Sequence, residues 1–336
     1  KALASGRELG LAADRIYSDY KQMAAAEKAR PDGIDAVSIV TPNHLHAPVA
    51  AAFMEAGIDV ICDKPLCLTS KEARELIAVR DRSRVVFALT HHYSCYPMVR
   101  QARAMIAAGD LGEIRLVQGE YVQDWLTTPL ETTGQKQADW RTDPARSGAG
   151  GCVGDIGTHT YHLGCFMSGL EADTLSADLA TFVAGRKLDD NVHVMLRYRG
   201  GARGLLWSSQ VAPGNENALM IRIYGSKAGL EWRQEDPNYL WFTPHGEPKR
   251  LLTRSGAGAG PAAARVTRVP PGHPEGYLDA FGTMYSEAAR AIRARRSGQP
   301  LAADVEFPTL EDGLAGMRFI EACVASSAAN GQWVVV

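Results

Sequence analysis

The segment 34–66 constrains the fold more than any other part of the chain. An apolar run over residues 36–40 is followed by a helical pattern over 48–56 and by a second apolar run over 58–62. A strand, a helix and a strand joined by short linkers form a parallel βαβ unit. Strands that are apolar throughout are buried on both faces, as in doubly wound sheets. The pattern therefore predicts an α/β fold with a parallel sheet.

Polar residues follow both strands of this unit. Residues 41–46 read Thr-Pro-Asn-His-Leu-His, and residues 63–65 read Asp-Lys-Pro. A third buried strand over 85–89 ends in the same way, at the polar segment 90–93. Because open parallel sheets bind ligands outside the carboxyl ends of their strands, we expect the functional site at these three segments.

The character of the chain changes near residue 92. Beyond it, short strand patterns follow one another closely, separated by Gly-rich turns, which predicts an α+β domain with a large, mostly antiparallel open sheet. Its expected strands cover residues 114–121, 174–183, 191–198, 202–210, 219–224 and 230–233, and its expected helices cover 97–107, 277–295 and 310–328. We therefore predict two domains, 1–92 and 93–336.

The first domain lacks one expected feature. A dinucleotide-binding sheet opens with a strand, a Gly-rich turn and a helix. Residues 1–33 have helical patterns without G-x-G-x-x-G, and the first clear strand pattern begins at Ile34. The expectation is a partial Rossmann domain whose N-terminal part lies outside this sequence.

Composition excludes several classes of function. The 36 basic and 38 acidic residues give a net charge of -2 without a long basic run, which disfavours nucleic acid and anionic membranes as partners. No apolar stretch approaches the roughly 20 residues of a membrane span. The six cysteines form no C-x-x-C pair, which indicates reduced thiols and a cytoplasmic protein.

A second polar cluster follows the glycines of residues 148–154. In a helix that starts near Asp155, the residues Asp155, His159 and His162 share one face. A carboxylate one turn from an imidazole can orient the ring and hold it ready to accept a proton. The alternative interpretation is that Asp155 caps the helix and the histidines are ordinary core or surface residues.

Four segments together resemble the glucose–fructose oxidoreductase / inositol dehydrogenase (Gfo/Idh/MocA) family: 41–46, 63–65, Trp140-Arg141 and 154–159. The resemblance covers nearly the whole chain, although Asp63 stands where the family usually has Glu. It implies a Rossmann domain followed by an α/β domain whose open sheet often forms the subunit interface. It also implies hydride transfer between NAD or NADP and the hydroxyl or carbonyl of a sugar, sugar derivative or cyclitol.

The resemblance assigns catalytic roles to three residues. Lys64 would hold the reacting hydroxyl, His159 would be the general base of oxidation, and Asp155 would tune both. Such a trio makes physical sense because hydride leaves a carbon readily only as its hydroxyl loses a proton. No metal is expected.

The same resemblance suggests binding residues. The expected cofactor contacts are Thr41, Pro42, Asn43, His46, Asp63, Lys64, Trp140 and Arg141, with the last two near the phosphates. The expected substrate contacts are His91, Tyr93 and His162, and the stretch 123–138 is expected to shape the rim of the pocket.

Two other functions compete with the dehydrogenase. One is a non-catalytic protein that senses sugars or nucleotides on the same fold, and the other is a metal-dependent hydrolase that uses Asp155 and the histidines. A homodimer or homotetramer through the second domain's sheet is expected, because Leu206, Trp207 and Val211 are candidates for an apolar outer face.

Overall fold

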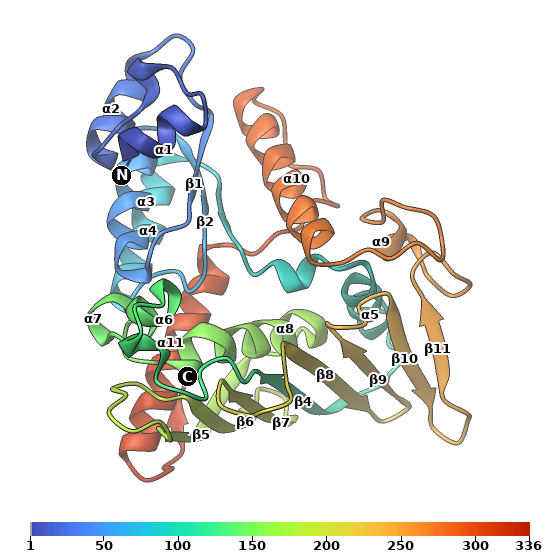
Figure 1. Ribbon diagram of the computed structural model, residues 1–336. Helices are drawn as coiled ribbons and strands as arrows, with labels where there is room; N and C mark the ends of the chain where they lie inside the picture. The colour runs from blue at the N-terminus through green and yellow to red at the C-terminus, as the bar shows by residue number, and fades with distance from the viewer. Residues whose placement is uncertain (1) are drawn as a thin grey trace.

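Two β-sheets organise the chain in the computed structural model, which describes residues 2–336. The small sheet lies among the N-terminal helices, and the large sheet forms the opposite side of the molecule (Figure 1). The small sheet holds β1 (Ala36–Ile39), β2 (Asp59–Cys62) and β3 (Phe87–Leu89), all parallel. The predicted α/β class, with a small parallel sheet and a large, mostly antiparallel one, is confirmed.

Eleven α-helices accompany the sheets within the described residues. Their bounds are α1 Ala2–Glu8, α2 Tyr20–Ala29, α3 His46–Glu55, α4 Ser70–Ser83, α5 Pro97–Ala107, α6 Lys136–Arg141, α7 Pro144–Ser147, α8 Thr158–Ser168, α9 Pro261–Ala264, α10 Tyr277–Arg296 and α11 Leu310–Ala328. The helices α3 and α4 lie on one side of the small sheet and α10 lies on the other (Figure 1). Both faces of that sheet are thus covered, as its apolar strands require.

The large sheet has nine strands in the order β11-β10-β9-β8-β4-β7-β6-β5-β12. Its strands are β4 Ile114–Val122, β5 Ala172–Ala180, β6 Asn191–Tyr198, β7 Arg203–Ser209, β8 Ala218–Gly225, β9 Ala228–Arg233, β10 Tyr239–Pro244, β11 Arg250–Thr253 and β12 Val334–Val335. Every pairing is antiparallel except that of β4 with β7. Helix α8 lies across one face of this sheet (Figure 1).

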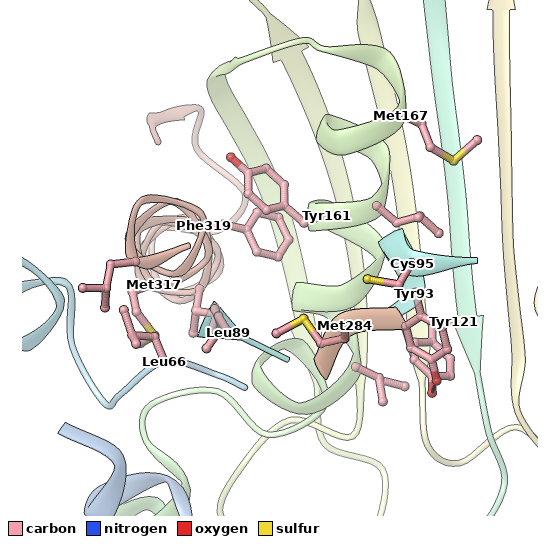
Figure 2. Packing of buried hydrophobic residues seen from close by; sticks show 14 of the residues in the cluster. Leu66, Leu89, Tyr93, Cys95, Tyr121, Tyr161, Met167, Met284, Met317 and Phe319 are labelled. Atoms are coloured by element: carbon pink, nitrogen blue, oxygen red, sulfur yellow. Dashed lines mark hydrogen bonds between the residues drawn. The ribbon is translucent and has the colours of Figure 1, made fainter. Parts of the chain in front are cut away.

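Helix α11 joins the two sheets. Its Met317 and Phe319 belong to the same buried cluster as Leu66 and Leu89, which follow β2 and end β3 (Figure 2). Helix α11 also contacts α8: the ring of Phe319 stacks on Tyr161 of α8, with the ring centroids 4.3 Å apart. The C-terminal part of the chain thus returns to the first sheet and fixes α8 relative to the strand ends.

The sequence predicts most of these elements. The helices over 97–107 and 310–328 are confirmed to the residue. The sequence pattern does not predict β10 or the edge strand β11, which are short; β10 pairs with β9 and with β11.

The prediction that Leu206 faces outward is wrong. Leu206 is 2% exposed, whereas its neighbour Leu205 is 48% exposed. Side chains alternate between the two faces of a strand, so an error of one residue exchanges the faces.

Candidate active site

The carboxyl ends of the three parallel strands carry the predicted polar residues and lie side by side. Asp63, after β2, accepts hydrogen bonds on Oδ1 from the Thr90 hydroxyl at 2.5 Å and from the Lys64 backbone N–H at 3.1 Å. These bonds tie the ends of β2 and β3 together. They also fix the backbone from which the Lys64 side chain extends.

Lys64 forms a half-buried ion pair with Asp155. Its Nζ lies 3.0 Å from Asp155 Oδ1 and also donates to the Asp155 backbone carbonyl. Both side chains are mostly enclosed, at 14% and 16% exposure. The structure therefore brings together two of the three predicted catalytic residues.

The second oxygen of Asp155 has two further partners. Gln210 Nε2 donates to Oδ2 at 2.9 Å, and Arg141 Nε forms an ion pair with it at 3.3 Å. Burial by itself raises the pKa of Asp155, but the charges of Lys64 and Arg141 outweigh it and hold the pKa below its usual range. Asp155 is therefore ionised at neutral pH.

Asp155 does not start an α-helix, contrary to the sequence prediction. It lies within a π-helical turn, Val153–Gly157, that runs directly into α8. Asp189 holds this turn by accepting the backbone N–H groups of Gly151 at 2.6 Å and Val153 at 2.8 Å. Gly151 is required here, because a Cβ at that position would meet the Asp189 carbonyl oxygen at 2.3 Å. π-Turns are rare and occur often at functional sites.

His159 is the second residue of α8 and is 5% exposed. A close approach of α8 to the sheet places it there, since a Cβ on Gly119 of β4 would meet Thr160 Cγ2 at 2.4 Å. Burial, assisted by the positive charge of Lys64, lowers the pKa of His159 well below its ordinary value. A neutral imidazole with a free ring nitrogen can accept a proton.

These groups line one cavity of about 560 Å³. Its lining residues are Asp63, Lys64, Thr90, His92, Tyr93, Tyr121, Gln123, Trp125, Gln135, Gln137, Arg141, Asp155, Ile156, His159, Asn217, Tyr277 and Phe281. Four of them come from the stretch 123–138, which confirms that this segment shapes the pocket. The three predicted catalytic residues all line this cavity.

The three predicted substrate residues occupy different places. Tyr93 lines the cavity, but His91 and His162 are not among its lining residues. His91 lies behind His159, with the two Nδ1 atoms 3.3 Å apart, and its ring stacks on His162 at 4.3 Å between centroids. His162 Nε2 lies 3.9 Å from Asp312 of α11.

His92 lines the cavity where the sequence suggests His91. Its ring stacks on Phe281 at 4.1 Å, and burial lowers its pKa to about 3. Consecutive residues after a strand give no signal of which histidine turns toward the cavity, so the sequence alone does not separate the two.

An uncharged hydrogen-bond network forms another part of the cavity wall. The Tyr93 and Tyr121 hydroxyls lie 2.7 Å apart, and the Tyr121 hydroxyl donates to Asn217 Oδ1 at 2.9 Å. Gln123 Nε2 donates to the same oxygen at 2.7 Å, and Trp125 Nε1 donates to Gln123 at 3.0 Å. Sequence reasoning does not find Tyr121 or Asn217, because strand and turn residues of these types carry no motif.

The residues predicted to contact the nicotinamide side follow β1 in the chain. Thr41 Oγ1 and Asn43 Oδ1 are buried and have no hydrogen-bond partner among the described residues. Pro42 lies between them, at the start of the turn Asn43–Leu45. Unpaired buried polar atoms at a strand end suit a ligand that supplies amide and hydroxyl groups, so these residues fit the nicotinamide end of a dinucleotide.

His46, in contrast, is engaged within the protein. Its two ring nitrogens lie 2.8 Å from the backbone oxygens of Pro65 and Thr41. It thereby connects the segments after β1 and β2, and both of its ring nitrogens are already occupied.

The predicted phosphate contacts, Trp140 and Arg141, lie at the end of α6. The guanidinium of Arg141 stacks over the Trp140 ring at 4.2 Å and faces Asp155 inside the cavity. The geometry places Arg141 beside the Asp155 carboxylate. Trp140 does not line the cavity but supports Arg141 from behind.

Two features are absent from residues 2–336. No group of three or more histidine, cysteine or acidic side chains there could hold a metal ion. None of the described helices is both long and apolar enough to cross a membrane.

Comparison with known proteins identifies the family to which this chain belongs. Residues 2–91 match the oxidoreductase family with an NAD-binding Rossmann fold, and residues 99–231 match the Gfo/Idh/MocA C-terminal domain. Together the two matches cover more than half of the chain. The chain belongs to the Gfo/Idh/MocA oxidoreductase family, whose Rossmann domain binds NAD(P).

Particular relatives extend over nearly the whole chain. An uncharacterised oxidoreductase of Bacillus subtilis, YfiI, is 36% identical over 98% of this chain and 84% of its own length. An oxidoreductase from Sinorhizobium meliloti is 56% identical, with a TM-score of 0.89 over 99% of this chain and 88% of that one. An inositol dehydrogenase homologue from Azotobacter vinelandii, solved with NADH and myo-inositol, is 37% identical, with a TM-score of 0.93 over 100% and 86%.

Proposed function

We propose that this oxidoreductase transfers hydride between NAD(P) and a hydroxyl-bearing or carbonyl carbon of a sugar, sugar derivative or cyclitol. One observation carries the proposal: Lys64, Asp155 and His159 line a single cavity beside the carboxyl ends of the parallel strands. The myo-inositol bound by the Azotobacter vinelandii homologue supports a polyol as the substrate.

The three residues divide the work on the substrate proton. When bound, the nicotinamide supplies or accepts the hydride. His159, neutral because of its burial, accepts the hydroxyl proton during oxidation and returns it during reduction. Its Nδ1 faces His91, which leaves Nε2 for this transfer.

Lys64 contacts the same substrate oxygen, and Asp155 positions Lys64. The ammonium of Lys64 donates a hydrogen bond to the reacting oxygen and stabilises negative charge that develops on it. Asp155 holds the ammonium in position at 3.0 Å and balances its charge. The pair is prearranged, so little reorganisation is needed when the substrate binds.

The uncharged wall orients the remaining hydroxyls. Tyr93, Gln123 and Asn217 offer donors and acceptors in a fixed network, the kind of surface that polyols require. His92 and Phe281 add an apolar edge.

The test is an assay of the purified protein with NAD and with NADP against a panel of sugars and inositols. We expect reduced nicotinamide to form with at least one polyol and not with simple alcohols that lack the other hydroxyls. Binding of cofactor without turnover on the entire panel would instead support a sensing function.

We also propose a homodimer or homotetramer through the outer face of the large sheet. Leu116, Met195, Leu205 and Tyr224 come from four neighbouring strands and are 38–50% exposed. A contiguous apolar sheet face of this kind usually marks an interface. The six cysteines are all free, which supports a reducing, cytoplasmic location.

Light scattering of Leu205→Glu tests the interface. The wild-type protein should give the mass of a dimer or tetramer and the variant a smaller mass. Leu301→Glu is the matched control, because Leu301 is 51% exposed in a loop away from this face. A wild-type protein that is monomeric at micromolar concentration would overturn the proposal.

A further inference from the structure

A second cavity, of about 930 Å³, adjoins the active-site cavity. Two residues, Asn217 and Tyr277, line both cavities. The second cavity lies between the turn that precedes β8, the turn that joins β9 to β10, and the segment that leads into α10. The two cavities are therefore neighbours, and Asn217 and Tyr277 lie at their common boundary.

The hydrogen-bond network of the active site extends into this second cavity. Asn217 accepts from Tyr121 and Gln123 on the active-site side. On the other side its Nδ2 donates to Gln234 Oε1 at 3.1 Å, and Gln234 lines the second cavity. Polar groups suited to hydroxyls thus continue across the boundary without interruption.

Tyr277 provides an aromatic surface at the same boundary. It is 48% exposed, yet its ring is held by an edge contact with His92 at 4.7 Å and a tilted contact with Phe281 at 5.1 Å. A fixed, half-exposed ring offers an apolar face at low entropic cost.

The second cavity is acidic. Glu216, Glu235 and Asp236 line it and are exposed, and none of its lining residues within the described chain is Lys, Arg or His. A phosphate or carboxylate on a ligand would find no cationic partner there and would be repelled.

We infer that the second cavity binds an additional, uncharged sugar unit, so that the substrate is a neutral disaccharide or a glycosylated cyclitol. This inference rests on the proposed function. The active-site cavity must hold the reacting ring together with the nicotinamide end of the cofactor, because Asp63 and Thr90 at the strand ends line it too. A second ring therefore extends past Asn217 and Tyr277 into the adjoining space.

The first experiment compares kcat/KM for glucose and myo-inositol with that for maltose, cellobiose, gentiobiose and galactosyl-inositol. At least one of the two-ring compounds should exceed its one-ring counterpart by about tenfold or more, because hydrogen-bonding sites are left unfilled by the smaller substrate. The uronic acid form of the best two-ring substrate should lose this advantage.

The outcomes separate the inference from the function on which it rests. Turnover of single rings with no gain for any two-ring compound would overturn the second cavity's role and leave the dehydrogenase standing. No turnover of any compound would overturn the proposed function itself. Quenching of Trp125 fluorescence, measured without turnover, should report tighter binding of the two-ring compound than of the single ring.

A charge-reversal variant provides an independent check. Glu216→Lys combined with Asp236→Lys should raise kcat/KM for the uronic acid form relative to the neutral disaccharide by about tenfold, since attraction replaces repulsion. Neither side chain has a hydrogen bond to lose within residues 2–336. The control is Asp110→Lys combined with Glu113→Lys, at exposed positions between α5 and β4, which changes the net charge by the same amount as the double variant. An unchanged ratio of the two substrates in the double variant would overturn the assignment.

Discussion

The two walls of the active-site cavity differ in charge and in how they are held. The wall at the strand ends carries Lys64, Asp155 and Arg141, which are joined by ion pairs of 3.0 and 3.3 Å. The other wall, with Tyr121, Gln123 and Asn217, contains neutral side chains joined by hydrogen bonds. Charged groups suit the stabilisation of a developing charge, whereas neutral networks suit the recognition of hydroxyls.

Because of this difference, substitutions in the two walls should affect different kinetic constants. An interaction that strengthens only in the transition state affects kcat, whereas one made equally by bound substrate affects KM. Damage at the strand ends should therefore appear mainly in kcat, and damage at the neutral wall mainly in KM.

The largest effect is expected from the two groups that we propose act on the substrate proton. Lys64→Ala and His159→Ala should each reduce turnover by about 10²–10⁴-fold, the usual contribution of positioned acid–base groups. Affinity for the cofactor should stay nearly unchanged, and the double variant should lose much less than the product of the single losses, because the residues act as a unit.

Steady-state oxidation of the best polyol measures these losses, with His245→Ala as a control at an exposed histidine. Because the pKa of His159 is lowered from 6.5, the acid limb of the wild-type kcat/KM profile should lie below pH 6.5. Full turnover by His159→Ala would refute its role and direct attention to another histidine.

A smaller effect, on stability, is expected at the ion pair that joins Lys64 to the π-helical turn. Asp155→Asn leaves the cations of Lys64 and Arg141 without a counter-charge in a largely enclosed site. The free energy of unfolding should fall by about 1–3 kcal/mol, less than for a fully buried pair. Urea unfolding at pH 7 measures this loss, and Asp110→Asn is the exposed control.

The stability loss should depend on pH with a definite sign. The folded-state pKa of Asp155 is depressed below 3.8, so its contribution is complete above that pH and declines as pH falls further. The difference in unfolding free energy between wild type and Asp155→Asn should be constant from pH 5 to 7 and shrink below about pH 4. A difference that grows on acidification would contradict the ion pair.

Asp189 lies in the same region and should behave in the opposite way. It is buried behind the π-helical turn, and burial raises its pKa to about 6 despite two backbone hydrogen bonds. A raised pKa means that its contribution to stability is present below pH 3.8 and is lost as pH rises through about 6. As pH rises from 4 to 7, the Asp189→Asn variant should therefore lose less stability than the wild-type protein. Thermal unfolding at a series of pH values measures this difference. An identical pH dependence of the two proteins would contradict the raised pKa.

The two walls also differ in how far the sequence predicts them. Lys64 and Asp155 lie in short contiguous segments, one after a strand and one after a glycine-rich turn, so local patterns indicate them. The π-helical turn is missed, because it depends on the hydrogen bonds that Asp189 accepts from residues 36 and 38 positions away along the chain.

The neutral wall could not be predicted in this way. Tyr121 is the next-to-last residue of β4, and Asn217 directly precedes β8. They meet because β4 and β8 pair with Tyr121 opposite Leu219. Tyr277 joins them from α10, which returns to the site after more than fifty intervening residues. Only the tertiary pairing, which no local pattern encodes, brings these side chains to one cavity.

The smallest effect is expected at the neutral wall and tests the contrast most directly. Asn217→Ala removes the oxygen that accepts from Tyr121 and Gln123, so both donors lose their fixed orientation. Two hydrogen bonds with a net worth of roughly 1 kcal/mol each predict a rise in KM of about thirtyfold, with kcat changed by less than about threefold. Gln299→Ala, at an exposed amide in the loop after α10, should change neither constant. Steady-state kinetics on the best single-ring polyol supplies both values, and a fall in kcat as large as that of Lys64→Ala would show that the two walls do not divide binding from chemistry.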